Sequence, residues 1–172
     1  MTPPEVERAF AQHKDAVFRF AWRMSASLAT AEDITQEVFL GLLRGTVRFD
    51  TTRGSLRGFL LGVARNLALK RLRTDARWEP IDEEQFLARP LAVDGFEASE
   101  LVGRAVGALP PLQREVLILA EYEECSLDEI ARAVDANVGT VKSRLHRARE
   151  NLRRMLAPLR AGAHPGSGHG TD

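Results

Sequence analysis

Apolar residues recur every three or four positions along most of this chain, the spacing that gathers them on one face of an α-helix. In the first half, the spacing runs through three segments, residues 5–28, 30–47 and 55–74. Thr30 and Ser55 stand where residues that cap a helix N-terminus are expected. Three helices of this length can bury one shared core, so the sequence predicts a helical domain over residues 1–75.

The spacing is lost over residues 76–97, which contain Pro80, Pro90 and Gly95 together with an acidic excess. Prolines and glycines interrupt helices, so this stretch predicts a flexible linker. Helical spacing resumes near residue 97 and predicts a second domain over residues 98–160. The last stretch, 161–172, holds four glycines and no large apolar side chain, so we expect it to be a disordered tail.

The second predicted domain ends in a helix–turn–helix pattern. Ser126 and Glu129 have the spacing of a capping box, which marks the start of a short helix over 127–134. A tight turn at 135–137 leads into a long basic helix over 138–156. The sequence therefore predicts an all-α fold of two small helical domains, joined by a flexible linker, with the helix–turn–helix in the second.

The composition argues against several classes of protein. The chain has 172 residues, of which 44% are hydrophobic, and its formal net charge is zero. Cys125 is the single cysteine, so neither an internal disulfide nor a CxxC zinc site is expected, and we expect no metal or other cofactor. No stretch approaches the 18 apolar residues of a membrane helix. We therefore expect a soluble, cytoplasmic protein.

The zero net charge conceals alternating blocks. Residues 53–77 hold seven cations and one anion, and residues 138–156 hold six cations and one anion. Residues 79–100 and 115–135 each hold seven anions and one cation. One basic block alone is readily explained as a solvated helix face. Two such blocks in one small chain favour a polyanionic partner.

The basic helix after the turn has the features of a DNA recognition helix, whose first turn enters the major groove. Lys142 and Arg147 have the chemistry to donate to guanine, and Arg144 suits a phosphate. The other interpretation is an ordinary helical hairpin with a basic face. The predicted DNA-contacting residues are Asn137, Thr140, Lys142, Ser143, Arg144, His146 and Arg147.

These residues also carry a family resemblance. The segment LPPLQREVLILAEYEECSLDEIARAVDANVGTVKSRLHRARENLRRML resembles the C-terminal region of extracytoplasmic-function (ECF) sigma factors, the small bacterial promoter-specificity subunits of RNA polymerase. AEDITQEVFLGLLRGTVRFD is similar to the family's segment that docks on core polymerase, and RGSLRGFLLGVARNLALKRLR is similar to its promoter-melting segment. The resemblance covers residues 10–75 and 98–157, in the family's order.

The resemblance implies a role for each segment. The recognition-helix residues would read the minus-35 element of a promoter. Core polymerase binding would fall to Asp33, Gln36, Glu37 and Phe39, which match the pattern D-x-x-Q-E-x-F. Minus-10 recognition and strand opening would fall to Arg53, Ser55, Leu56, Arg57, Phe59, Arg65, Asn66, Lys70 and Arg71. The implied partners are core RNA polymerase, promoter DNA and an anti-sigma factor.

Some positions depart from the family pattern. Leu56 and Phe59 stand where Phe and Trp are frequent, which changes the shape expected of the minus-10 pocket. Asp135 and Glu124 stand where Gly is frequent. Asp tolerates left-handed backbone better than most residues, so we expect the turn at Asp135 to persist.

The sequence also bears on three other functions. No His, Cys and carboxylate set has spacing suited to catalysis, so the sequence argues against an enzyme. A helix–turn–helix regulator that acts without being a polymerase subunit would explain residues 110–156, but not the basic segment 55–74. A decoy that binds core polymerase and blocks it remains a third alternative.

Overall fold

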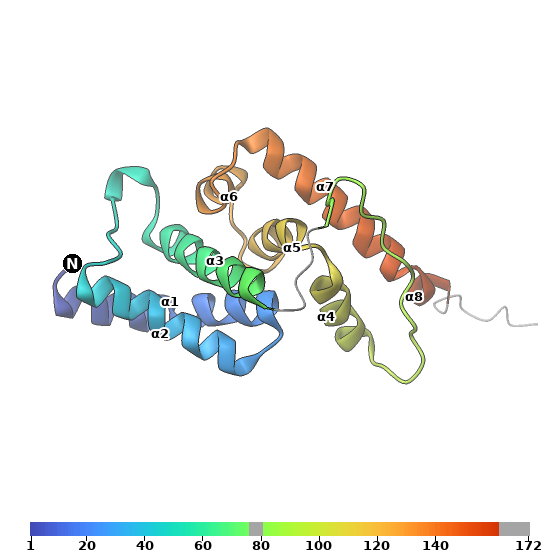
Figure 1. Ribbon diagram of the computed structural model, residues 1–172, viewed down its shortest axis with the longest axis horizontal. Coiled ribbons are helices and arrows are strands. Elements are labelled where there is room, and N and C mark those ends of the chain that lie inside the picture. Colours follow the sequence, from blue (N-terminus) through green and yellow to red (C-terminus); the bar gives the residue numbers. More distant parts are fainter. Residues whose placement is uncertain (76–80, 162–172) are drawn as a thin grey trace, which may run out of the picture.

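The computed structural model describes residues 1–75 and 81–161, and these residues form helices and loops without a β-strand (Figure 1). The first three helices are α1 (Pro3–Ser25), α2 (Leu28–Arg44) and α3 (Leu56–Thr74), with a short 3₁₀ turn (Thr51–Arg53) before α3. This confirms the predicted all-α fold.

The second group of helices follows the predicted helix–turn–helix order. It comprises α4 (Ala98–Ala108), α5 (Pro111–Leu117) with a π-helical extension (Ile118–Tyr122), α6 (Leu127–Ala133), α7 (Val138–Met155) and the short α8 (Ala157–Ala161). Ala161, which was expected in the disordered tail, instead ends α8. The rest of that predicted tail, 162–172, lies outside the described residues.

Local capping chemistry explains where the helices begin. Ser55 accepts a hydrogen bond from the Gly58 backbone amide and caps α3, as predicted. The capping box of Ser126 and Glu129 at α6 is also present. The predicted cap at Thr30 is wrong, because Ser27 caps α2 and accepts a hydrogen bond from the Thr30 amide.

The two helical groups pack against each other instead of lying apart. One continuous cluster of buried apolar side chains runs from Phe20 and Leu60 in the first group to Leu119 and Ile130 in the second. α3 packs against α6, and α1 contacts α4 and α5 (Figure 1). A Cβ added to Gly62 would lie 3.2 Å from the Ala133 carbonyl oxygen, so glycine permits the close approach of α3 and α6.

The predicted linker is described from residue 81 onward, and residues 76–80 lie outside the described part. Residues 81–97 contain no α-helix, which agrees with the sequence. They are nevertheless held against the second helical group, because Ala88 is buried and its amide donates to Asn151 Oδ1 at 2.9 Å. The Leu91 amide donates to the Met155 carbonyl oxygen at 2.9 Å. This segment is therefore docked on α7 over much of its length.

Candidate nucleic-acid interface

The predicted recognition helix, α7, presents a polar face at its N-terminal end. Asn137 caps it, with Oδ1 accepting a hydrogen bond from the Thr140 amide at 2.8 Å. Lys142, Ser143 and His146 are exposed, whereas Val141 and Leu145 are buried beneath them. The turn before α7 contains Asp135 at φ 51°, the left-handed conformation that the sequence predicted an aspartate would tolerate.

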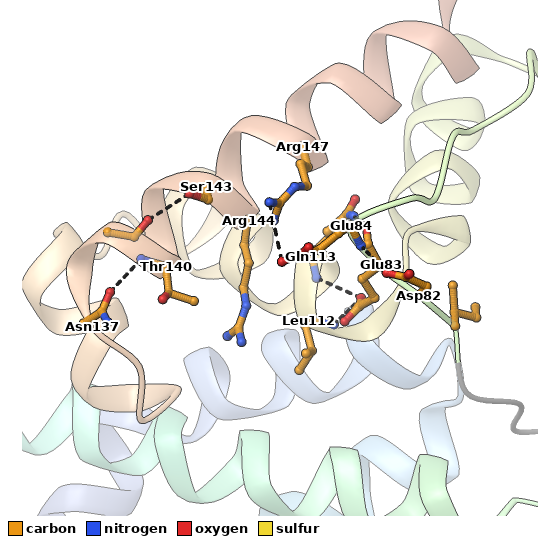
Figure 2. A pocket seen from close by; sticks show the side chains of 12 residues that line it. Asp82, Glu83, Glu84, Leu112, Gln113, Asn137, Thr140, Ser143, Arg144 and Arg147 are labelled. Carbon is orange, nitrogen blue, oxygen red and sulfur yellow. Dashed lines mark hydrogen bonds and ion pairs between the residues drawn. The ribbon is translucent and has the colours of Figure 1, made fainter.

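A groove of about 660 Å³ runs beside this face of α7 (Figure 2). Five of the seven predicted DNA-contacting residues line it: Asn137, Thr140, Ser143, Arg144 and Arg147. The opposite wall includes Asp82, Glu83 and Glu84 from the segment after the undescribed residues. Arg147 lies 3.9 Å from a Glu84 carboxylate oxygen. Acidic side chains therefore share the groove with the cations that were predicted to bind DNA.

Glu83 has a structural task in this groove. Its carboxylate accepts hydrogen bonds from the amides of Leu112, at 2.9 Å, and Gln113, at 3.4 Å. Burial raises the pKa of Glu83, although these hydrogen bonds and the charges of Arg144 and Arg114 act in the opposite direction. Glu83 thus ties the acidic turn to the start of α5.

Two of the predicted strand-binding cations of α3, Arg57 and Arg65, are paired with buried carboxylates of the chain. Arg65 makes two hydrogen bonds to Glu115, at 2.7 and 3.0 Å, and the Glu115 side chain is fully buried. Arg57 donates to Glu123 at 2.7 Å, and Arg19 donates to the same carboxylate. Burial raises the pKa of Glu115, and its pairing with Arg65 only partly offsets this effect.

A second cavity, of about 850 Å³, lies between the loop before α3 and α6. Phe59, Asn66, Arg53 and Ser55 from the predicted minus-10 set line one side, and Arg132 and Asp135 from the second helical group line the other. The Phe59 ring packs on Phe49, with 5.4 Å between centroids. The predicted base-binding loop therefore faces the helix–turn–helix domain.

The other predicted minus-10 residues lie in different local environments. The Asn66 side chain accepts a hydrogen bond from its neighbour Arg65 at 3.2 Å. Ser55 is the cap of α3, and Leu56 packs against the core. Lys70 is exposed.

The predicted polymerase-binding residues of α2 separate into two groups. Asp33, Gln36 and Glu37 are exposed, and Arg71 of α3 lies 3.5 Å from Asp33 and 3.3 Å from Glu37. Phe39 is buried and packs edge-on against Phe10, so the structure places it inside the bundle and not on the acidic surface. The Phe39 side chain therefore supports the α1–α2 contact.

Sequence reasoning missed the buried partners of the α3 cations. Glu115 lies on the apolar stripe of its helix, one position before Val116 and three after Leu112. A carboxylate on a buried stripe requires a compensating cation, and this signal was available in the sequence. Which cation it meets could not be read, because Arg65 is 50 residues distant in the chain.

The fold and these surfaces define a helical protein with two groups of helices, one of which carries a helix–turn–helix with a cationic recognition face. Residues 9–78 match the family described as sigma-70 region 2, and residues 99–152 match sigma-70 region 4. The chain belongs to the family of ECF RNA polymerase sigma factors.

Individual relatives agree with this assignment. The ECF RNA polymerase sigma factor SigE of Mycolicibacterium smegmatis is 33% identical over 162 residues, which cover 90% of this chain and 62% of that relative. The chain thus spans less than two thirds of SigE. SigW of Bacillus subtilis, also an ECF sigma factor, is 32% identical over 162 residues, which cover 86% of each chain.

Solved structures show the same fold. The sigma factor RpoE in complex with the anti-sigma factor NepR from Bartonella quintana aligns with a TM-score of 0.69 and 24% identity, over 89% of this chain and 97% of that one. CnrH in complex with the cytosolic domain of CnrY aligns with a TM-score of 0.63 and 20% identity, over 92% and 89%. Among the described residues of this chain, no helix is long and apolar enough to cross a bilayer.

Proposed function

We propose that this ECF sigma factor binds a promoter with two separate surfaces once core polymerase is bound. The N-terminal half of α7 reads the paired minus-35 element, and the loop before α3 together with the α3 cations holds the opened minus-10 strand. The observation that carries the first part is the exposed polar face of α7, with Lys142, Ser143 and His146 outward over a buried apolar stripe.

The contacts of the proposed minus-10 surface support a rearrangement of the two helical groups when DNA binds. Arg57 and Arg65 are held by Glu123 and Glu115, so an opened DNA strand has to compete with buried carboxylates for these guanidinium groups. An opened strand needs a cationic groove and a pocket for an unstacked base. We propose that the two helical groups move apart when the protein joins core polymerase and promoter DNA.

Core polymerase is proposed to bind the exposed acidic surface of α2, formed by Asp33, Gln36 and Glu37. We also propose an anti-sigma factor as a partner, because RpoE was solved in complex with the anti-sigma factor NepR and CnrH in complex with the cytosolic domain of CnrY. The chain would act in the cytoplasm, and its role would be recognition without catalysis of its own.

The function is tested by transcription with purified core polymerase. We expect the chain to start discrete RNAs from a subset of promoters in a genomic library, and to bind those promoters far more weakly without core enzyme. A regulator that works alone would instead bind its duplex tightly without polymerase. Tight binding of the isolated chain together with no transcript in the complete reaction would overturn the proposal.

Reversal of one charge on α2 tests the polymerase surface. Glu37→Lys places a cation beside Arg71 and removes a carboxylate from the exposed surface, so we expect weaker assembly with core polymerase, by about tenfold. Glu7→Lys is the matched control, because Glu7 is exposed on α1 and lies outside the proposed surface. Unchanged assembly of Glu37→Lys, measured by fluorescence titration, would contradict the assignment.

A further inference from the structure

The segment 81–91, here called the strap, is fixed to the helix–turn–helix domain by a series of polar contacts. The Gln113 side chain donates to the Glu83 carbonyl oxygen at 2.9 Å. The amides of Ala88 and Leu91 donate to Asn151 and Met155, both of α7. Asn151 is itself buried and also bonds Gln113, so the strap completes an internal polar network. These hydrogen bonds hold the strap in one position on the helix–turn–helix domain.

This docking places two acidic side chains beside the recognition helix. Glu83 serves as an anchor to the start of α5, whereas its neighbours Asp82 and Glu84 flank the groove shared with Arg144 and Arg147 (Figure 2). The Glu84 side chain is 80% exposed, and its carboxylate faces Arg147 at 3.9 Å. The Asp82 carboxylate accepts a hydrogen bond from the Glu84 amide at 3.2 Å, which keeps the turn compact.

We propose that the strap is an intramolecular competitor of DNA, which lowers the affinity of the free chain for duplex by holding Asp82 and Glu84 beside the recognition face of α7. This inference rests on the proposed function of α7. A phosphate that binds in the groove at Arg147 meets the Glu84 carboxylate, which lies 3.9 Å from that guanidinium group, with Asp82 lining the same groove. The Debye length is about 8 Å at physiological salt, so the repulsion between phosphate and Glu84 is only weakly screened. DNA has to displace Glu84 from Arg147 or bind against its charge.

The ion pair between Glu84 and Arg147 is solvent-exposed, as expected of a contact that DNA can displace. Exposed ion pairs contribute little free energy, so a well-matched promoter can replace this one. Sequence-independent binding depends almost entirely on phosphate contacts, so the strap opposes it directly.

The test uses the full chain and a fluorescent duplex of mixed sequence, followed by anisotropy at several salt concentrations. The double variant Asp82→Asn/Glu84→Gln keeps the hydrogen-bonding shape of both side chains and removes two negative charges. We expect it to bind the duplex about three- to tenfold more tightly than the unaltered chain, with a steeper salt dependence. Asp94→Asn/Glu97→Gln makes the same change in net charge on the same segment, beyond the strap, and should bind within about twofold of the unaltered chain.

A second variant detaches the strap without a change in charge. Ala88→Pro removes the amide that donates to Asn151, so we expect faster hydrogen exchange at Leu91 and tighter duplex binding. Equal affinity of the unaltered chain and both strap variants would overturn the inference and leave the role of α7 intact. An equal gain in both double variants would also overturn it, because net charge would then suffice. Absence of binding by every variant at low salt would overturn the inference, whereas the role of α7 within the polymerase complex is decided separately by the transcription test.

Discussion

Replacement of Arg65 by methionine is expected to lower the free energy of unfolding by about 3 kcal/mol, because it leaves the Glu115 carboxylate without its cation. The Glu115 side chain is 0% exposed and that of Arg65 is 14% exposed, so water reaches neither group freely. A buried charge without a partner is relieved only by protonation or by separation of α3 from α5. We therefore also expect faster amide exchange along the contact between the two helical groups.

Urea denaturation measures the loss of stability in Arg65→Met. A matched control tests whether removal of any arginine from the chain has the same effect. Arg53→Met makes the same substitution at a side chain that is 86% exposed and lies 3.9 Å from Asp50. We expect that change to cost less than about 0.5 kcal/mol. The double variant Arg65→Met/Glu115→Gln removes the buried charge as well and should recover most of the lost stability. No recovery in the double variant would show that packing, and not the orphaned carboxylate, causes the loss.

The pH dependence gives an independent check on Glu115. Burial raises its pKa in the folded chain above the ordinary value. A raised carboxyl pKa means that the folded state binds the proton more strongly, so this group favours folding at low pH and loses that contribution as pH rises through the folded pKa. The stability deficit of Arg65→Met is therefore expected to shrink as pH falls from neutral toward the carboxyl range.

Lys142→Ala is expected to reduce discrimination at a single base pair of the minus-35 element by about 1–3 kcal/mol, because a major-groove donor to guanine is lost. Lys142 is exposed on the first turns of α7, over the buried Val141 and Leu145, so the substitution leaves the fold intact. Transcription from a panel of single-substituted promoters measures the effect position by position.

The control for this prediction comes from the same helix. Arg154 is an exposed cation near the C-terminal end of α7, and Arg154→Ala should weaken all promoters slightly and equally. If Lys142→Ala also lowered transcription equally from every promoter in the panel, Lys142 would contact phosphate, and the proposed base contact would be wrong.

Much of the local structure was predictable, because its causes lie within a few residues of each other. The apolar spacing located α1, α2, α3 and α7 to within a few residues, and the capping pairs at Ser55 and Ser126 marked two starts correctly. Thr30 failed as a cap because Ser27, three residues earlier, offers the same chemistry to the Thr30 amide. The capping rule therefore predicted the right kind of side chain for the start of α2 but the wrong one of two nearby residues.

The surfaces assigned to separate partners were less predictable. Arg71 was assigned to DNA, and Asp33 and Glu37 to polymerase, yet Arg71 lies within ion-pair distance of both carboxylates. The acidic linker was expected to be flexible, yet Ala88 and Leu91 in its described part are hydrogen-bonded to α7. In each case, charge counts along the chain identified the groups, while the packing of α2 on α3 and of the strap on α7 determined their partners.

By itself, the sequence determined the helices, the helix–turn–helix and the outward polar face of α7, because a period of 3.6 residues and a capping side chain act over one or two turns. Only the tertiary structure decided that Glu115 holds Arg65 and that Glu84 faces Arg147, pairs separated by 50 and 63 positions. Such pairings depend on how whole helices pack through a shared apolar core. That packing is set by the sum of many weak, non-directional contacts, which no short stretch of sequence contains.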